Sequence, residues 1–184
     1  MSMEREQWKG DGQKGVKVIM VTGGQRSGKS VFAEKFALEL SDRPIYLATA
    51  RVFDSEMQQR VDIHKERRKE RWVNLESPLY IAENEFSDRD VVLLDCLTLL
   101  ATNWFFEMKE SSSTALSKLK NQLEKVFSSG ATFIVVTNEV GLGGISANAM
   151  QRHFADLQGA INQYVAGLAE EVYMIISGIP VKIK

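Results

Sequence analysis

The sequence predicts an α/β protein in which helices flank a largely parallel sheet. Short runs of β-branched residues alternate along the chain with longer segments of helical periodicity, and strands separated by helices pair in parallel through right-handed crossovers. The chain has 184 residues, and a single domain holds roughly 100–200 residues. Because no internal repeat and no linker interrupts the pattern, we expect one domain over 16–184, preceded by a disordered tail over 1–15.

The elements of the first half follow from the spacing of apolar residues and from the turn-forming residues between them. Apolar runs that glycine or proline interrupts predict strands, and apolar residues at every third or fourth position predict helices. In order, these elements are a strand over 16–22, a helix over 27–40, a strand over 45–49, a long, mostly solvated helix over 54–71, a short strand over 72–75 and a short helix over 78–85.

The second half begins with the clearest buried strand, an apolar run that ends at Asp95. The elements expected here are a strand over 90–95, a helix over 97–108, a helix from the 111–114 break to 127, a strand over 131–137, a glycine-rich loop over 141–144, a helix over 148–169 and strands over 171–177 and 180–183. So few residues separate the last two strands that they must pair as an antiparallel hairpin.

Charge and cysteine content narrow the class of protein. The 23 basic and 24 acidic side chains give a formal charge of −1, whereas proteins that bind a phosphate backbone carry a basic excess, so we expect no nucleic-acid partner. Cys96 is the single cysteine, which excludes an internal disulfide and a multi-cysteine metal site. The start is polar and no apolar run reaches roughly 18 residues, so we expect no membrane insertion and a cytoplasmic location.

A glycine-rich octapeptide connects the first expected strand to the first expected helix. It matches the phosphate-binding pattern G-x-x-x-x-G-K-[ST] and reads Gly23, Gly24, Gln25, Arg26, Ser27, Gly28, Lys29, Ser30. The backbone N–H groups of such a loop curl around a polyphosphate at a helix N-terminus. Lys29 would reach the β- and γ-phosphates, and the Ser30 hydroxyl would bind Mg²⁺. The pattern predicts a P-loop NTPase-type, RecA-like fold that binds a nucleoside triphosphate.

Asp95 ends an expected strand, where phosphate-loop sites place a second carboxylate that directs Mg²⁺. We therefore predict Ser30 and Asp95 as the metal ligands. The alternative is that Asp95 caps the helix that starts near Leu97. Asn138 and Glu139 follow another strand at its carboxyl end, where open α/β sheets bind ligands.

Five segments, taken together, resemble one family throughout. They are Val21–Ser30, Tyr46–Thr49, Arg60–Lys65, Val136–Gly141 and Ser177–Lys184, which follow one another in the family's order. The family is the bifunctional adenosylcobinamide kinase / adenosylcobinamide-phosphate guanylyltransferase of cobalamin biosynthesis. The resemblance runs from Val16 to Lys184.

This resemblance implies two reactions and a homotrimer. The first reaction phosphorylates adenosylcobinamide with ATP or GTP to give adenosylcobinamide phosphate. The second transfers GMP from GTP onto that phosphate through a GMP–histidine intermediate, giving adenosylcobinamide-GDP. The family histidine precedes a lysine, and His64 occupies that place. A neutral imidazole is a competent nucleophile near neutral pH; the alternative is a packing histidine. His153 is expected to be structural.

The resemblance also places nucleotide contacts outside the phosphate loop. They fall on Ala48, Thr49 and Ala50, on Lys65, Glu66, Arg67 and Arg68, and on the acidic positions Glu76 and Asp95. The cations beside His64 would neutralise the triphosphate and the departing pyrophosphate, although a solvated helix face is the alternative. Glu76 would accept hydrogen bonds from guanine N1–H and N2–H₂, which makes it the expected guanine reader.

Two other functions compete with this interpretation. A simple small-molecule or nucleoside kinase would use Lys29, Ser30 and Asp95 but would leave His64 without a task. An ATPase-type regulatory module related to recombinase-like proteins would need a nucleic-acid or protein partner, and the charge of −1 gives that reading little support.

Overall fold

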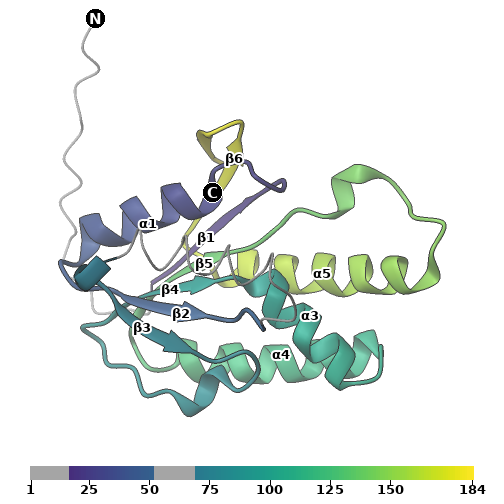
Figure 1. The fold of residues 1–184 in the computed structure, drawn as a ribbon, viewed down its shortest axis with the longest axis horizontal. Coiled ribbons are helices and arrows are strands. Elements are labelled where there is room, and N and C mark those ends of the chain that lie inside the picture. Colours follow the sequence, from purple (N-terminus) through teal and green to yellow (C-terminus); the bar gives the residue numbers. More distant parts are fainter. Residues whose placement is uncertain (1–16, 52–68) are drawn as a thin grey trace, which may run out of the picture.

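The computed structural model describes residues 17–51 and 69–184. Within them, seven strands form one sheet in the order β3-β2-β4-β5-β1-β6-β7 (Figure 1). Strands β1 to β6 pair in parallel, and β7 runs antiparallel to β6. The predicted parallel sheet and its C-terminal hairpin are therefore confirmed.

The elements of the described residues begin and end close to their predicted bounds. The strands are β1 (Val18–Gly23), β2 (Ile45–Ala48), β3 (Val73–Glu76), β4 (Val91–Asp95), β5 (Thr132–Val136), β6 (Glu171–Ile176) and β7 (Ile179–Lys182). The α-helices are α1 (Lys29–Leu40), α3 (Leu97–Glu107), α4 (Ser112–Phe127) and α5 (Ala149–Leu168). Single turns of 3₁₀ helix are η1 (Lys69–Arg71), η2 (Ile81–Glu83) and η3 (Gly141–Gly143).

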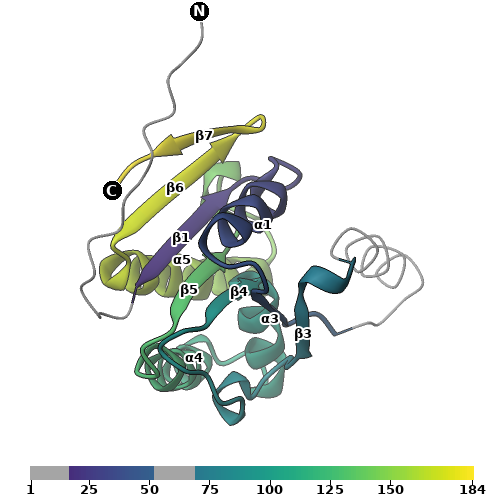
Figure 2. The same cartoon turned by 90° about the vertical axis from the view of Figure 1, so that its left-hand side faces the viewer.

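Helices cover both faces of the sheet, with α1 on one face and α3, α4 and α5 on the other (Figures 1 and 2). Alternate residues of each strand point to opposite faces. In β1, Ile19 and Val21 pack with α1, whereas Val18 and Met20 pack with the other three helices. Burial on both faces explains why the central strands have continuous apolar runs rather than alternating ones.

The expected helix over 78–85 is wrong: this segment contains only the single 3₁₀ turn η2. Its first carbonyl groups accept hydrogen bonds from α3 side chains instead of from the next helical turn. The Asn103 amide donates to the Pro78 carbonyl at 2.7 Å, and the Trp104 indole donates to the Leu79 carbonyl at 3.1 Å. Tertiary contacts therefore override the local helical pattern.

Other differences are small. The helix expected over 27–40 begins at Lys29, because Gly28 has a left-handed conformation with φ of 101° and acts as the N-cap. The expected glycine-rich loop over 141–144 contains the single turn η3. The tail over 1–15 and most of the long helix expected over 54–71 lie outside the described residues, which resume at the turn η1.

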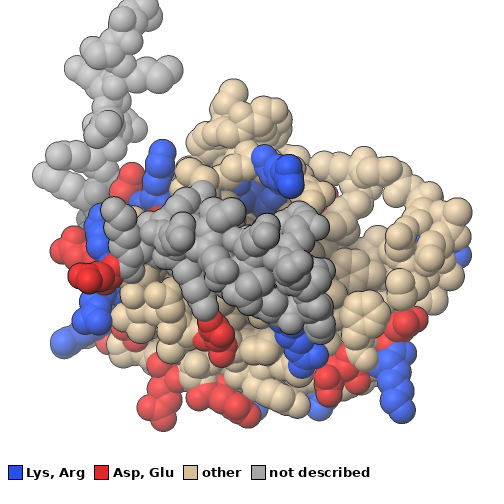
Figure 3. Space-filling model, viewed as in Figure 1, with Lys and Arg blue, Asp and Glu red and all other residues tan. Residues whose placement is uncertain are grey.

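The distribution of charged side chains on the surface agrees with the near-balanced charge of the sequence. On the face shown in Figure 3, basic and acidic side chains of the described residues lie interspersed rather than in one patch. None of the helices described within 17–51 and 69–184 combines the length and the apolar character needed to cross a membrane.

Glu171, at the start of β6, links β7 to the residue that precedes β1. Its carboxylate binds Lys17 at 2.9 Å and Lys182 at 3.2 Å, and it accepts a hydrogen bond from the Tyr173 hydroxyl at 2.6 Å. Burial acts to raise the pKa of Glu171, but these three partners outweigh it and lower the pKa from 4.5 to about 2. The ionised form therefore stabilises the folded state.

We expect this carboxylate to make stability depend on acid pH. A pKa lowered on folding gives stabilisation that is complete above the unfolded pKa and disappears as the pH falls through the folded pKa. Glu171→Gln should cost about 1–2 kcal/mol at pH 7 after solvent screening, and the difference from the native chain should vanish toward pH 2. Urea unfolding from pH 7 to pH 2 measures it, with the exposed neighbour Glu170→Gln as the control. A constant difference across this range would contradict the assignment.

Candidate nucleotide site

The loop over 23–30 joins β1 to α1 at the carboxyl edge of the sheet, as predicted. Gly23 lies so close to β6 that a Cβ atom there would sit 2.5 Å from the Ile175 carbonyl oxygen. Arg26 and Gly28 have positive φ angles of 58° and 101°, which turn the backbone back toward the helix. Glycine is therefore required at Gly23 by close approach and favoured at Gly28 by conformation.

The turn between β6 and β7 braces this loop from outside. The Gly178 N–H donates a hydrogen bond to the Ser27 carbonyl at 2.8 Å. A Cβ atom at Gly28 would lie 3.3 Å from the Cα atom of Gly178, so the two backbones are in contact. The C-terminal hairpin is thus a structural part of the phosphate loop.

Lys29 is buried at the start of α1, and its ammonium group donates to the Gly24 carbonyl at 2.6 Å. Burial lowers the pKa of Lys29, while the charge of Asp95 acts in the opposite direction. The carboxylate therefore lies within electrostatic reach of the ammonium group. An anion bound in the loop would favour the charged lysine further.

The loop also holds a polar atom that a ligand can satisfy. Within the described part of the chain, the Ser27 hydroxyl is buried and has no hydrogen-bond partner. Buried polar groups are normally paired. An unpaired hydroxyl inside a loop that surrounds a helix N-terminus fits the binding of phosphate oxygens.

Asp95 ends β4, and its Oδ2 atom accepts a hydrogen bond from the Tyr46 hydroxyl at 2.7 Å. Tyr46 comes from the neighbouring strand and is held edge-on against Trp72, with ring centroids 5.9 Å apart. The alternative in which Asp95 caps α3 is wrong, because Cys96 is the N-cap and its sulfur accepts from the Leu99 N–H. The Asp95 carboxylate is therefore oriented by Tyr46 rather than by the helix.

Three of the predicted contacts line up across the carboxyl edge. Ala48 pairs with Glu76 on one side and with Asp95 on the other. Neighbouring strands lie roughly 4.8 Å apart, so Glu76 and Asp95 are separated by about two strand spacings. Glu76 is exposed, which suits it for contact with the nucleobase. Asp95 is half-buried, which suits it for interaction with the buried charge of Lys29.

Thr49 is fully buried, and all its polar atoms are engaged within the protein. Its hydroxyl donates to the Cys96 carbonyl at 2.7 Å and accepts from the Cys96 N–H at 2.9 Å. Its own N–H donates to the Asp95 carbonyl, and its carbonyl accepts from Asn103. Thr49 therefore positions the neighbouring Ala48 and Ala50 and the end of β4.

The donor set near the loop suits Mg²⁺. Magnesium takes oxygen ligands, uses one or two protein groups and keeps water and phosphate oxygens around it. Ser30 supplies a hydroxyl directly after Lys29, and Asp95 supplies a carboxylate that acts on the same lysine. Among the described residues no cluster of three or more His, Cys, Asp or Glu could hold a metal by itself.

A buried polar network missed by the sequence analysis fixes the end of β5. The Thr137 hydroxyl donates to Asn162 at 2.7 Å, and Gln158 donates to both. Asn138 is held through its N–H by the Thr98 hydroxyl and through its carbonyl by Asn162. The available signal was the pair of amides four residues apart on the buried face of α5.

The remaining predicted residues lie outside the described ranges, away from the site, or on the exposed part of the phosphate loop. His64, Lys65, Glu66, Arg67 and Arg68 all lie outside the described residues. His153 is exposed on α5, and its carbonyl accepts a hydrogen bond from Ser112. Gln25 and Arg26 are exposed at the top of the phosphate loop.

The fold and this site together define a phosphate-loop nucleotide-binding protein, with the loop after β1 and an acidic residue at the end of β4. The family model described as "Cobinamide kinase / cobinamide phosphate guanyltransferase" matches residues 19–183. The chain belongs to this family.

Relatives support the assignment over nearly the whole chain. The chain is 35% identical to the bifunctional adenosylcobalamin biosynthesis protein CobU of Escherichia coli (strain K12) and 34% identical to that of Salmonella typhimurium (strain LT2), covering 91% of this chain and 99% of each relative. It is 33% identical to the bifunctional protein CobP of Pseudomonas aeruginosa, covering 90% of this chain and 96% of that relative.

We expect Lys29→Ala to slow phosphoryl transfer to cobinamide severely while the fold persists. Such transition states are stabilised mainly by positioning and charge, so kcat should fall about 10²-fold or more. Initial rates with ATP and with GTP measure the loss, and circular dichroism checks folding. Lys35→Ala, on an exposed turn of the same helix, is the matched control. A folded Lys29→Ala variant with the native rate would refute the phosphate-loop assignment.

Proposed function

We propose that this chain phosphorylates adenosylcobinamide with ATP or GTP and then transfers GMP from GTP onto the product through His64. The observation that carries the proposal is the braced phosphate loop, with buried Lys29 and Tyr46-oriented Asp95 beside it, in a member of the cobinamide kinase / guanyltransferase family. ATP or GTP is the phosphate donor, GTP is the GMP donor, and GMP bound to His64 is the covalent intermediate.

The first reaction is phosphoryl transfer. The hydroxyl of the aminopropanol arm attacks the γ-phosphorus, the bond from that phosphorus to the nucleoside diphosphate breaks, and the hydroxyl proton passes to solvent water. Lys29 and the backbone N–H groups over 24–30 neutralise charge on the phosphate oxygens. Ser30 and Asp95 would hold Mg²⁺, which when bound supplies further neutralisation of the triphosphate.

The second reaction is guanylyl transfer in two displacements. A ring nitrogen of His64 attacks the α-phosphorus of GTP, and the bond to pyrophosphate breaks. A phosphate oxygen of adenosylcobinamide phosphate then attacks the same phosphorus, and the P–N bond breaks to release His64. In this proposal Lys65, Arg67 and Arg68 stabilise pyrophosphate, with Glu66 beside them.

In this proposal the guanine base is recognised at the carboxyl end of β3, where Glu76 lies. Exposed Glu76 is proposed to accept from guanine N1–H and N2–H₂, Ala48 lies beside it on β2, and Ala50 follows Thr49, which holds the backbone. We also propose that the chain assembles as a homotrimer, which sedimentation equilibrium of the purified protein tests.

Substitution of His64 should distinguish guanylyl transfer from phosphoryl transfer, because only the first reaction uses this side chain. We expect His64→Ala to abolish both covalent labelling by GTP labelled at the α-phosphate and formation of adenosylcobinamide-GDP, because the nucleophile itself is removed. Kinase activity should remain measurable, since phosphoryl transfer needs no histidine attached to the nucleotide. The label on the native chain should be labile to acid and stable to base, as a phosphoramidate is.

His153→Ala is the matched control and should keep the label. Labelling of the His64 variant but not of the His153 variant would overturn the nucleophile assignment. A native chain that phosphorylates cobinamide but never takes up label would favour the simple kinase.

Glu76 should discriminate between the nucleotides. A carboxylate pairs with guanine and is repelled by the acceptor N1 of adenine, so Glu76→Gln should weaken GTP binding about tenfold and ATP binding much less. Competition titrations with both nucleotides measure the ratio, and Glu85→Gln, also exposed, is the control. Equal losses for GTP and ATP would remove Glu76 from the base site.

A further inference from the structure

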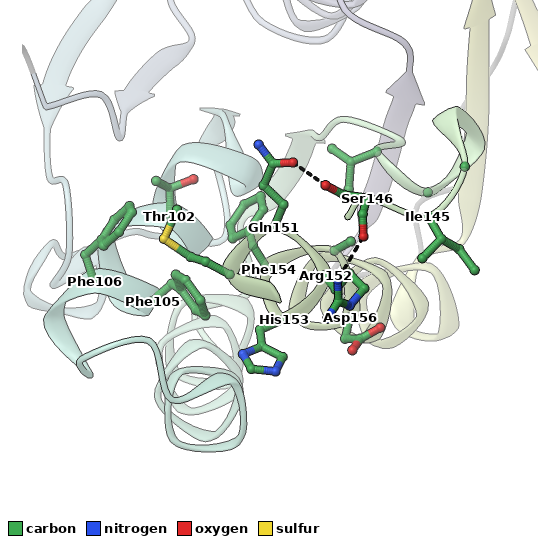
Figure 4. A pocket seen from close by; sticks show the side chains of 15 residues that line it. Thr102, Phe105, Phe106, Ile145, Ser146, Gln151, Arg152, His153, Phe154 and Asp156 are labelled. Atoms are coloured by element: carbon green, nitrogen blue, oxygen red, sulfur yellow. Dashed lines mark hydrogen bonds between the residues drawn. The ribbon is translucent and has the colours of Figure 1, made fainter. Parts of the chain in front are cut away.

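A hollow of about 800 Å³ lies between α3, the loop over 140–146 and the first turns of α5 (Figure 4). The nucleotide site described above does not use it. Concave sites of this size, with mostly apolar walls and a few polar groups, are the usual form of a small-molecule site.

Aromatic rings form one side of the hollow. Phe105 from α3 packs edge to face against Phe106 and against Phe154 of α5, with ring centroids 5.6 and 5.7 Å apart. Phe106 is 54% exposed, so a broad ring face is available to a ligand. Ile145, which is 93% exposed, lies on the opposite side in Figure 4.

The rim of the hollow is polar and built from hydrogen-bonded side chains. The Ser146 hydroxyl and the Gln151 amide are joined by a hydrogen bond. Arg152 donates to the carbonyls of Ser146 at 3.0 Å and Ala147 at 2.8 Å, which fixes the loop on α5. Amide and hydroxyl groups of this kind pair with amides of a ligand.

The hollow is connected to the phosphate site by the loop that follows β5. The Glu139 N–H donates to the Gly23 carbonyl at 3.1 Å, so the start of this loop rests on the phosphate loop. Asn138 is fixed by Thr98 and Asn162. The next residue, Val140, already lines the hollow. The wall of the hollow therefore begins one residue after the segment that rests on the phosphate loop.

We infer that this hollow binds the corrin macrocycle of the cobinamide substrate. Cobinamide combines a wide ring system with apolar faces, amide side chains on its periphery and an aminopropanol arm that ends in the hydroxyl to be phosphorylated. The exposed ring of Phe106 contacts the apolar face, with buried Phe105 packed behind it, and Ser146 and Gln151 pair with peripheral amides. The arm follows the loop toward Gly23. This inference rests on the proposed function.

A second copy of this chain is the competing occupant of the hollow. The concave shape, the amide-pairing rim and the direct connection to the phosphate loop favour the macrocycle, because none of these features is needed by an interface between copies. The experiment must therefore measure cobinamide binding and oligomeric state on the same variants.

Equilibrium dialysis with adenosylcobinamide, followed by its visible absorbance, tests the inference. Phe106→Ala removes an exposed ring without opening the core, and it should raise the Kd for adenosylcobinamide about tenfold or more. Labelling by GTP should stay at the native level. Leu168→Ala removes an exposed apolar side chain at the far end of α5 and should change neither quantity.

The outcomes separate this inference from the proposed function. An unchanged Kd in Phe106→Ala, or a native chain that binds no adenosylcobinamide, overturns the inference. A changed mass by light scattering with an unchanged Kd also overturns it, in favour of a second copy. A Phe106-dependent Kd in a native chain that forms no phosphorylated product supports the hollow while refuting the proposed function.

Discussion

The close approach between the end of β1 and strand β6 is the constraint on which the site depends. No side chain fits between Gly23 and the Ile175 carbonyl, so the strand ends in glycine and turns at once into the phosphate loop. Contact between Gly28 and Gly178 fixes the other end of the same loop. Between these two points the backbone of the loop has little freedom to collapse, and the Ser27 N–H holds it further by donating to the Gly24 carbonyl at 3.3 Å. The loop is therefore organised before any ligand arrives.

Many polar side chains at the carboxyl edge hold the backbone rather than face a ligand. Thr49 links the ends of β2 and β4, and Tyr46 sets the direction of the Asp95 carboxylate. Thr137, with its amide partners on α5, does the same for the end of β5. Each of these bonds is buried or half-buried, where an unpaired group would be costly. The arrangement fixes the backbone around Lys29 and Asp95 without using either charged group as a structural support for the strand ends.

Most of the fold could be predicted from the sequence because its signals are local. The continuous apolar runs of β4 and β5 result from burial on both faces, and the phosphate loop carries its own pattern of glycines. The predictions that were wrong concern segments whose conformation depends on residues distant in the sequence. The carbonyls of Pro78 and Leu79 accept hydrogen bonds from side chains of α3, and no local sequence pattern predicts these contacts. Cys96 rather than Asp95 caps α3, because Tyr46 from another strand engages the aspartate.

The contact between the β6–β7 turn and the phosphate loop has a consequence for folding during synthesis. Chains fold progressively as they emerge from the ribosome. The strand that begins the phosphate loop emerges well before Gly178, which completes its support. Until then β1 lacks its neighbour β6 and presents an unpaired apolar edge, the kind of surface that associates with other chains. The nucleotide-binding loop of the nascent chain thus stays without its support until β6 and β7 have been synthesised, and chaperones that shield strand edges would act in that interval.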